Sequence, residues 1–138
     1  MRRPRTNRDK RSYHHGNLAE ALIDAALDLI REFGPAGFSF AEVTRAVGVS
    51  PAAPYRHFRD RDALMAEVAR RGFEKFADKL AKAWNKGGPD SMTALKNVGK
   101  AYLAFARAEP AYYAAMFEAR LPADMSRDLS KASDDAFA

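Results

Sequence analysis

The stretch of residues 38–62 constrains the fold of this chain more than any other segment. Ser39 and Glu42 have the S-x-x-E spacing of a capping box, which predicts a helix that begins at Phe40. Gly48 predicts the end of that helix, because glycine adopts a positive φ at low cost. The stretch therefore opens with a short helix that has a defined start and a defined stop.

A second short helix is predicted after the glycine turn. Ser50 before Pro51 has the pattern of an N-cap followed by a first helical residue. Pro54 would then be the fourth helical residue, in a splayed first turn, because proline offers no amide hydrogen to the carbonyl of Ser50. The alternative start is Pro54 itself with Ala53 extended; we expect the start at Pro51. Two such helices form a helix-turn-helix, whose second helix fits the major groove of DNA.

The second helix has a surface suited to nucleic acid. Within seven residues it carries five side chains that can reach phosphates or base edges, with little acid between them: Tyr55, Arg56, His57, Arg59 and Arg61. By itself this pattern fits a DNA-contacting surface and a solvated charged helix equally well, because short motifs carry a real false-positive risk.

Helical periodicity continues through the rest of the chain, and no segment has the pattern of a β-strand. We expect helices from Asn17 to Gly34, from Asp60 to Gly87, from Asp90 or Ser91 to Glu109, from Pro110 to Leu121, and for a turn or two from Ala123. The first three of these helices begin at an expected N-cap: Asn17, Asp60, and Asp90 or Ser91. Gly72 lies inside the long helix and predicts a bend or close packing. The expected fold is all-α: a three-helix helix-turn-helix domain in residues 13–62, joined by a long helix to a C-terminal bundle in residues 63–138.

The positive charge of the chain is concentrated at its N-terminus. The net charge is +5, and residues 1–11 carry six basic side chains against Asp9, whereas the rest has 17 basic and 17 acidic residues. The six are Arg2, Arg3, Arg5, Arg8, Lys10 and Arg11. Residues 1–12 lack apolar periodicity, so we expect a disordered basic arm. Such an arm fits nucleic-acid binding and a solubilising tail equally well.

The first helix has an acidic outer face. Its acidic residues follow one another four positions apart: Glu20, Asp24, Asp28 and Glu32. DNA phosphates would repel this row of like charge. We therefore expect the helix to support the fold and to face away from DNA, except at its N-terminal end.

Composition excludes several classes of function. The chain has no cysteine, so disulfides, thiol catalysis and cysteine-ligated zinc are excluded. Its histidines, at positions 14, 15 and 57, form no His-Glu-x-x-His motif, and no nucleophile–base pair or phosphate loop is found. We therefore expect no metal, no cofactor and no enzyme. Because no apolar run approaches about 20 residues and the basic N-terminus lacks a signal-peptide core, we expect a cytoplasmic protein without a membrane partner.

The second half of the chain is rich in aromatic side chains. The members of this group are Trp84, Tyr102, Phe105, Tyr112, Tyr113, Met116 and Phe117. Any one of them is most simply explained as part of a core. Together they could line an apolar pocket in which a few hydroxyl groups orient a ligand.

One segment also resembles a known family. The residues that carry the resemblance are Gly48-Val49-Ser50, Tyr55-x-His57-Phe58 and Arg61-x-x-Leu64. At this spacing they are similar to the DNA-binding domain of the tetracycline-repressor (TetR) family of bacterial regulators. With the helix expected at residues 17–34, the likeness covers about a third of the chain. Pro54 departs from the pattern, because leucine is usual at its position.

The resemblance implies roles for individual side chains. Phosphates would be held by Tyr55, His57, Arg61 and the helix N-terminus at Ser39. Base edges would be met by the small apolar groups of Pro51, Ala52 and Ala53, which suit thymine methyls, and by the hydrogen-bonding side chain of Arg56. Arg45 completes the expected DNA-binding set.

The resemblance further implies a regulator of transcription. We expect a repressor that leaves its double-stranded operator when an unknown small apolar or aromatic ligand binds the aromatic group. Members of the family are usually longer and dimerise through two C-terminal helices. We therefore expect a homodimer, although residues 63–138 look like an incomplete ligand-binding and dimerisation region. The alternative function is a helical protein-interaction module without operator-specific DNA binding.

Overall fold

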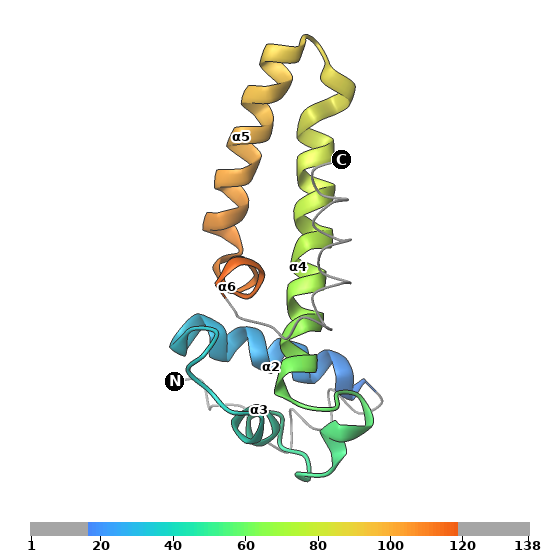
Figure 1. Ribbon diagram of the computed structural model, residues 1–138, viewed down its shortest axis with the longest axis vertical. Helices are drawn as coiled ribbons and strands as arrows, with labels where there is room; N and C mark the ends of the chain where they lie inside the picture. The colour runs from blue at the N-terminus through green and yellow to red at the C-terminus, as the bar shows by residue number, and fades with distance from the viewer. Residues whose placement is uncertain (1–16, 119–138) are drawn as a thin grey trace, which may run out of the picture.

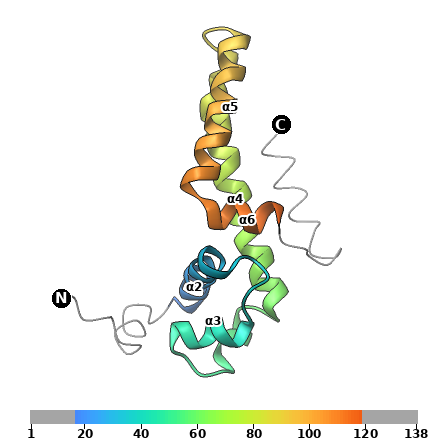
Figure 2. The same ribbon diagram turned by 90° about the vertical axis from the view of Figure 1, so that its left-hand side faces the viewer.

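The computed structural model describes residues 17–118 as an elongated, all-helical molecule. Its elements are α2 (Leu18–Phe33), α3 (Phe40–Val47), the 3₁₀ helix η1 (Ala53–Arg56), α4 (Arg61–Trp84), the 3₁₀ turn η2 (Asn85–Gly87), α5 (Ser91–Ala108) and α6 (Pro110–Phe117). In Figures 1 and 2, α4 and α5 form an upright hairpin on a base made of α2, α3 and η1. The short helix α6 lies between the base and the hairpin. The all-α prediction is confirmed.

The caps predicted from the sequence set the starts of α2, α3, α4 and α5. The side chain of Asn17 accepts from the amide of Glu20 at the start of α2, and the Ser39 capping box is complete at α3. Asp60 Oδ1 accepts from an amide of α4, and Asp90 Oδ1 accepts from an amide of α5, each at 2.9 Å. Each cap satisfies an amide that the helix leaves without a partner.

Two apolar cores follow each other along the molecule. The first joins α2, α3, Phe58 and the first half of α4 to Ala111 and Ala115 of α6. The second joins the later part of α4 to α5 and to Met116 of α6. Because α4 and α6 contribute to both cores, the helices beyond residue 62 complete the packing of the helix-turn-helix unit.

Gly72 lies where α6 packs against α4. A Cβ atom built on Gly72 would lie 2.7 Å from Met116 Sδ and 3.2 Å from Tyr112 Cδ1. The first distance is shorter than real Cβ contacts and the second is tighter than most, so a side chain at this position would require Met116 and Tyr112 to shift. The close packing expected at Gly72 is therefore found.

Candidate nucleic-acid interface

The first half of the helix-turn-helix is a short helix fixed at both ends. Glu42 N donates to Ser39 Oγ at 3.1 Å, and Ser39 N donates to Glu42 Oε1 at 3.3 Å. At the other end Gly48 has a φ of 85° and donates its N–H to Thr44 O. Val43 is buried on the inner face, whereas Arg45 is exposed on the outer face. The capped helix therefore presents Ser39 and Arg45 to solvent.

The expected second helix differs from the observed one. The chain does coil after Ser50, but Pro51 and Ala52 form a turn, and the helix from Ala53 to Arg56 is 3₁₀ rather than α. The prediction of an α-helix that begins at Pro51 is therefore wrong. So is the alternative with Ala53 extended, because Ala53 is the first residue of η1.

Proline chemistry explains this shorter, tighter helix. Because Pro54 has no amide hydrogen, the carbonyl of Ser50 accepts from Ala53 N, three residues on, at 3.1 Å. The carbonyl of Pro54 then accepts from both His57 N and Phe58 N, each at 3.0 Å. Together these bonds enclose a 3₁₀ helix of four residues.

Burial divides the residues of this segment into two sets. Pro54 and Phe58 are buried, and Phe58 belongs to the first core. Pro51, Ala52, Tyr55, Arg56 and His57 are exposed, and Ala53 is half-buried. The side chains expected to meet DNA therefore face solvent on one short, anchored segment. Whether they contact DNA stays a prediction.

Tyr55 joins the two halves of the helix-turn-helix. Its ring packs edge-on against the ring of Phe40 in α3, with centroids 5.3 Å apart and planes at 62°. The residue remains 59% exposed, so the packing uses one side of the ring only. This arrangement fixes the direction of the Tyr55 side chain and leaves most of its surface to solvent.

Arg61 has partners within the protein. Its Nε donates to Phe38 O at 2.9 Å, its Nη2 donates to Pro35 O, and its guanidinium lies 4.5 Å from the centroid of the Phe38 ring. Arg61 therefore ties the first turn of α4 to the loop that precedes α3. The family resemblance implied a phosphate contact for Arg61, which stays a prediction; in the structure Arg61 positions the helix-turn-helix.

The exposed surface of the helix-turn-helix is basic. Arg59 makes an ion pair with Asp60, whereas in the described residues Arg45 and Arg56 make none. The basic arm, with Arg2, Arg3, Arg5, Arg8, Lys10 and Arg11, lies outside the described residues, and its role stays a prediction. Histidines 14 and 15 also lie outside them.

The aromatic group expected to bind a ligand is not a single cluster. Trp84 is 42% exposed at the tip of the α4–α5 hairpin, away from α6. Phe105 and Met116 are buried in the second core, where Phe76 also packs. Tyr112 joins both cores.

Three aromatic side chains remain together and partly open to solvent. The hydroxyls of Tyr102 and Tyr113 lie 2.9 Å apart, in hydrogen-bonding distance. Phe117 packs on Tyr113 at 4.9 Å between ring centroids and is 45% exposed. Hydrogen bonding to Tyr102 raises the pKa of Tyr113, so the Tyr113 phenol is neutral near pH 7 and can donate or accept a hydrogen bond.

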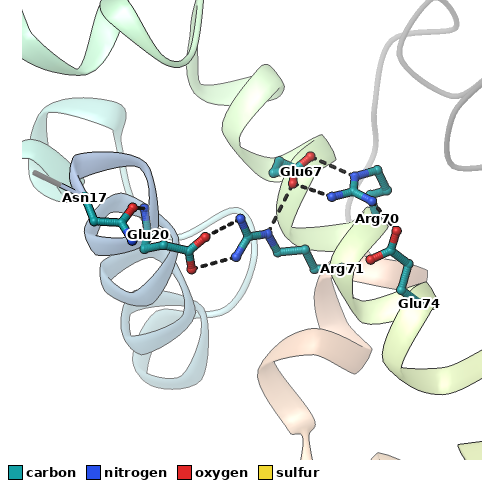
Figure 3. A network of polar contacts seen from close by, with 6 residues as sticks. All are labelled: Asn17, Glu20, Glu67, Arg70, Arg71 and Glu74. Atoms are coloured by element: carbon teal, nitrogen blue, oxygen red, sulfur yellow. Dashed lines mark hydrogen bonds and ion pairs between the residues drawn. The ribbon is translucent and has the colours of Figure 1, made fainter. Parts of the chain in front are cut away.

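One polar network was missed by the sequence reasoning. Figure 3 shows Arg71 of α4 donating two hydrogen bonds to the carboxylate of Glu20 in α2. These bonds hold the pKa of Glu20 below its ordinary value. Nothing in the sequence indicated this partner for Glu20, because Arg71 is 51 positions away along the chain.

Two other properties bear on the function. Within residues 17–118 no group of three or more potential ligands is placed to hold a metal ion. In the same range none of the helices is both long enough and apolar enough to cross a membrane.

Both halves of the chain match models of one protein family. Residues 22–68 match "Bacterial regulatory proteins, tetR family", and residues 95–138 match "Tetracyclin repressor-like, C-terminal domain". The first match contains α3, the turn and η1, which form the candidate interface.

Similar proteins carry regulator names. The HTH-type transcriptional regulator YobS of Bacillus subtilis is 32% identical over 100 residues, which are 72% of this chain and 51% of YobS. The HTH-type transcriptional repressor Rv3405c of Mycobacterium tuberculosis is 35% identical over 66 residues, 48% of this chain and 35% of that protein. This chain thus spans about half the length of YobS, and the match to Rv3405c covers about a third of that repressor.

A solved structure has the same arrangement of helices. It is a protein of unknown function from Rhodococcus sp. RHA1, with a TM-score of 0.75 and 30% identity over 90% of this chain and 64% of that one. The fold, the helix-turn-helix geometry and the two family matches agree. The chain belongs to the tetR family of bacterial regulatory proteins.

Proposed function

We propose that this protein is a sequence-specific DNA-binding regulator of transcription whose α3–turn–η1 surface contacts its operator. The observation that carries the proposal is the exposure of Arg45, Tyr55, Arg56 and His57 on a capped helix-turn-helix that the tetR-family match covers. A rigid unit with outward basic and phenolic groups can dock on phosphates without ordering its own backbone first.

The exposed residues suit two kinds of contact with DNA, to phosphates and to base edges. Tyr55 and His57 suit phosphates, as does the N-terminus of α3 behind Ser39, because a helix N-terminus favours negative charge. The surfaces of residues 51–53 are small and apolar and suit thymine methyls. Arg56 projects from the end of η1 and is the best placed side chain for a bidentate contact to guanine.

The basic arm would add affinity with little sequence preference. Residues 1–11 carry six basic side chains, and each phosphate contact releases condensed counterions from DNA. Arm contacts would therefore strengthen binding to every sequence and make it more dependent on salt.

We infer that the protein acts as a homodimeric repressor in the cytoplasm and releases DNA when a small ligand binds. Two recognition segments are needed for two operator half-sites. The exposed Met92, Leu95 and Leu103 on α5 supply apolar surface for contact with another helix. The partly exposed Tyr102, Tyr113 and Phe117 support an aromatic or apolar ligand that accepts a hydrogen bond.

Selection of bound duplexes from a random DNA pool tests the proposal. We expect recovery of a sequence with two half-sites, bound with an affinity that falls steeply as salt rises. Deletion of residues 1–11 should flatten the slope of log K against log salt by about 0.9 for each phosphate that the arm neutralises in the intact protein. Recovery of no preferred sequence would contradict operator binding and favour the protein-interaction alternative, whereas an unchanged slope would show that the arm does not touch DNA.

A further inference from the structure

Two arginines add polar attachments between α4 and the helix-turn-helix unit (α2, α3 and η1), beside the apolar packing of the first half of α4 in the first core. Arg61, in its first turn, binds the carbonyls of Pro35 and Phe38 in the loop before α3. Arg71 binds Glu20 of α2. At 1.5 Å per residue the two attachments lie about 15 Å apart along α4, which is enough to fix the direction of the helix against the unit.

The second attachment is a two-pronged ion pair between Arg71 and Glu20, and Glu67 binds the same guanidinium. Arg71 Nη1 lies 2.7 Å from Glu20 Oε2, and Arg71 Nη2 lies 2.5 Å from Glu20 Oε1. The Nε of Arg71 donates to Glu67 Oε1 at 3.1 Å, and this bond orients the guanidinium toward Glu20. Glu67 is in turn bound by Arg70, which also pairs with Glu74 (Figure 3).

The neighbouring arginines favour the ionised form of the Glu20 and Glu67 carboxylates. Hydrogen bonds from Arg71 hold the pKa of Glu20 below its ordinary value, and those from Arg70 do the same for Glu67. The side chains of Arg71 and Glu20 are 28% and 39% exposed, so water can replace each partner when the pair opens. An ion pair with this exposure can be opened at a moderate cost in free energy, unlike one sealed in a core.

The Arg71–Glu20 pair lies next to the part of α4 on which α6 packs. Gly72 follows Arg71 in the chain, and its missing side chain makes room for Tyr112 and Met116 of α6. The Tyr112 ring also lies 4.9 Å from Lys75 Nζ, and Lys75 pairs with Glu109 at the start of α6 at 3.5 Å. A displacement of α6 along α4 would therefore act on the turn of α4 that carries Arg71.

We propose that the Arg71–Glu20 ion pair is a positioning contact that holds the helix-turn-helix unit in its DNA-competent direction relative to α4 and α6. Arg61 is the pivot, because it joins the first turn of α4 to the loop beside α3. Arg71 is the releasable attachment, because α6 packs on the same turn of α4. The inference rests on the proposed function in one respect only: the direction of the unit sets how two recognition segments meet two half-sites.

A double-mutant cycle tests the contact against operator DNA selected by the wild-type full chain. Arg71→Gln and Glu20→Gln should each weaken binding roughly tenfold, and the double variant should bind about as well as either single variant, because the two residues share one interaction. Arg71→Lys keeps the charge but loses the fork, so its affinity should be intermediate. Glu74→Gln is the matched control: it removes an Arg70 contact within α4 and should leave affinity unchanged.

A distance measurement tests the same contact without DNA. The chain has no cysteine, so Glu32→Cys on α2 and Lys79→Cys on α4, both at exposed positions, accept spin labels specifically. The distribution of label distances should be narrow in the otherwise wild-type chain and broader, or shifted, with Arg71→Gln added. Glu74→Gln should leave it narrow.

The two measurements separate the possible failures. An unchanged distance distribution in Arg71→Gln overturns the inference, whatever the DNA result. So does additive weakening of operator binding in the double variant. If the wild-type chain selects no DNA at all, the proposed function fails, and the label distances still decide whether the ion pair sets the direction of the unit.

Discussion

The ring of Tyr55 packs edge-on against the ring of Phe40, and this contact joins η1 to α3 across the glycine turn. Phe40 is the first residue of α3, directly after the Ser39 cap. The aromatic contact therefore links the capped end of one helix to the exposed face of the next. It leaves 59% of Tyr55 accessible for a partner.

Tyr55→Phe should weaken DNA binding without unfolding the protein. The substitution keeps the ring on Phe40 and removes only the hydroxyl, whose hydrogen bond to a charged phosphate is worth about 1.5–3 kcal/mol. Operator affinity and thermal melting measured on the same preparation check this. A large fall in melting temperature, with unchanged affinity per folded molecule, would show that the hydroxyl serves the fold instead.

Arg56→Ala should change base preference, whereas Arg61→Ala should lower stability. Arg56 is exposed and unpaired among the described residues, so its loss should change base preference by about 1–3 kcal/mol of discrimination and leave stability unchanged. Arg61 binds two backbone carbonyls, so its loss should lower the free energy of unfolding by about 1.5–3 kcal/mol and weaken all operators alike. Urea unfolding and a panel of operator variants separate the two effects. Uniform weakening by Arg56→Ala would place that residue on a phosphate.

The local features of the fold could be predicted from the sequence, because their causes lie within a few residues. Asn17, Ser39, Asp60 and Asp90 each cap the helix that follows, through a bond that spans three positions. Gly48 ends α3 for an equally local reason, its positive φ.

The features that the sequence did not predict depend on distant or competing interactions. Glu20 and Arg71 are 51 positions apart, so no spacing rule connects them. The pattern at Ser50 and Pro51 is a sound helix start, but Pro54 changes which amide reaches the Ser50 carbonyl. Trp84 shares its aromatic character with the side chains around α6, but it is the last residue of α4 and lies at the far end of the hairpin.

Pro54→Ala should destabilise the protein, whereas Pro51→Ala should do so much less. The Pro54 ring is buried, and removing two methylenes from it should cost about 1.5 kcal/mol at about 0.8 kcal/mol each. Both substitutions loosen the unfolded chain similarly, so their difference isolates the burial. Equal unfolding free energies for the two alanine variants would contradict the packing role of Pro54.

Gly72→Ala and Gly99→Ala should differ in their effect on stability. A Cβ on Gly99 meets nothing within 4 Å, so alanine should stabilise α5 by up to about 1 kcal/mol through helix propensity. A Cβ on Gly72 meets Met116 at 2.7 Å, so the same gain should be offset by about 1–3 kcal/mol of overpacking. Chemical unfolding of the two variants measures the contrast. Equal stabilisation would mean that Met116 moves aside freely.

Acid should weaken the attachment between α2 and α4. The pKa values of Glu20 and Glu67 lie below their ordinary value of 4.5 in the folded protein, because Arg71 and Arg70 donate hydrogen bonds to their carboxylates. As the pH falls, the unfolded chain therefore takes up protons before the folded chain does. The stability that these carboxylates contribute is fully present above pH 4.5 and is lost as the pH falls through their lowered folded pKa values.

The unfolding free energy of the wild-type chain should consequently fall more steeply below pH 4.5 than that of Glu20→Gln, which has no such proton to bind. Urea unfolding at a series of pH values on both sides of 4.5 measures the two curves. Glu32→Gln is the control on the same helix, because Glu32 is exposed and has no ion pair in the described part of the chain. Its curve should follow that of the wild type. Parallel curves for Glu20→Gln and the wild type would show that the Arg71–Glu20 pair contributes nothing to the stability of the folded state.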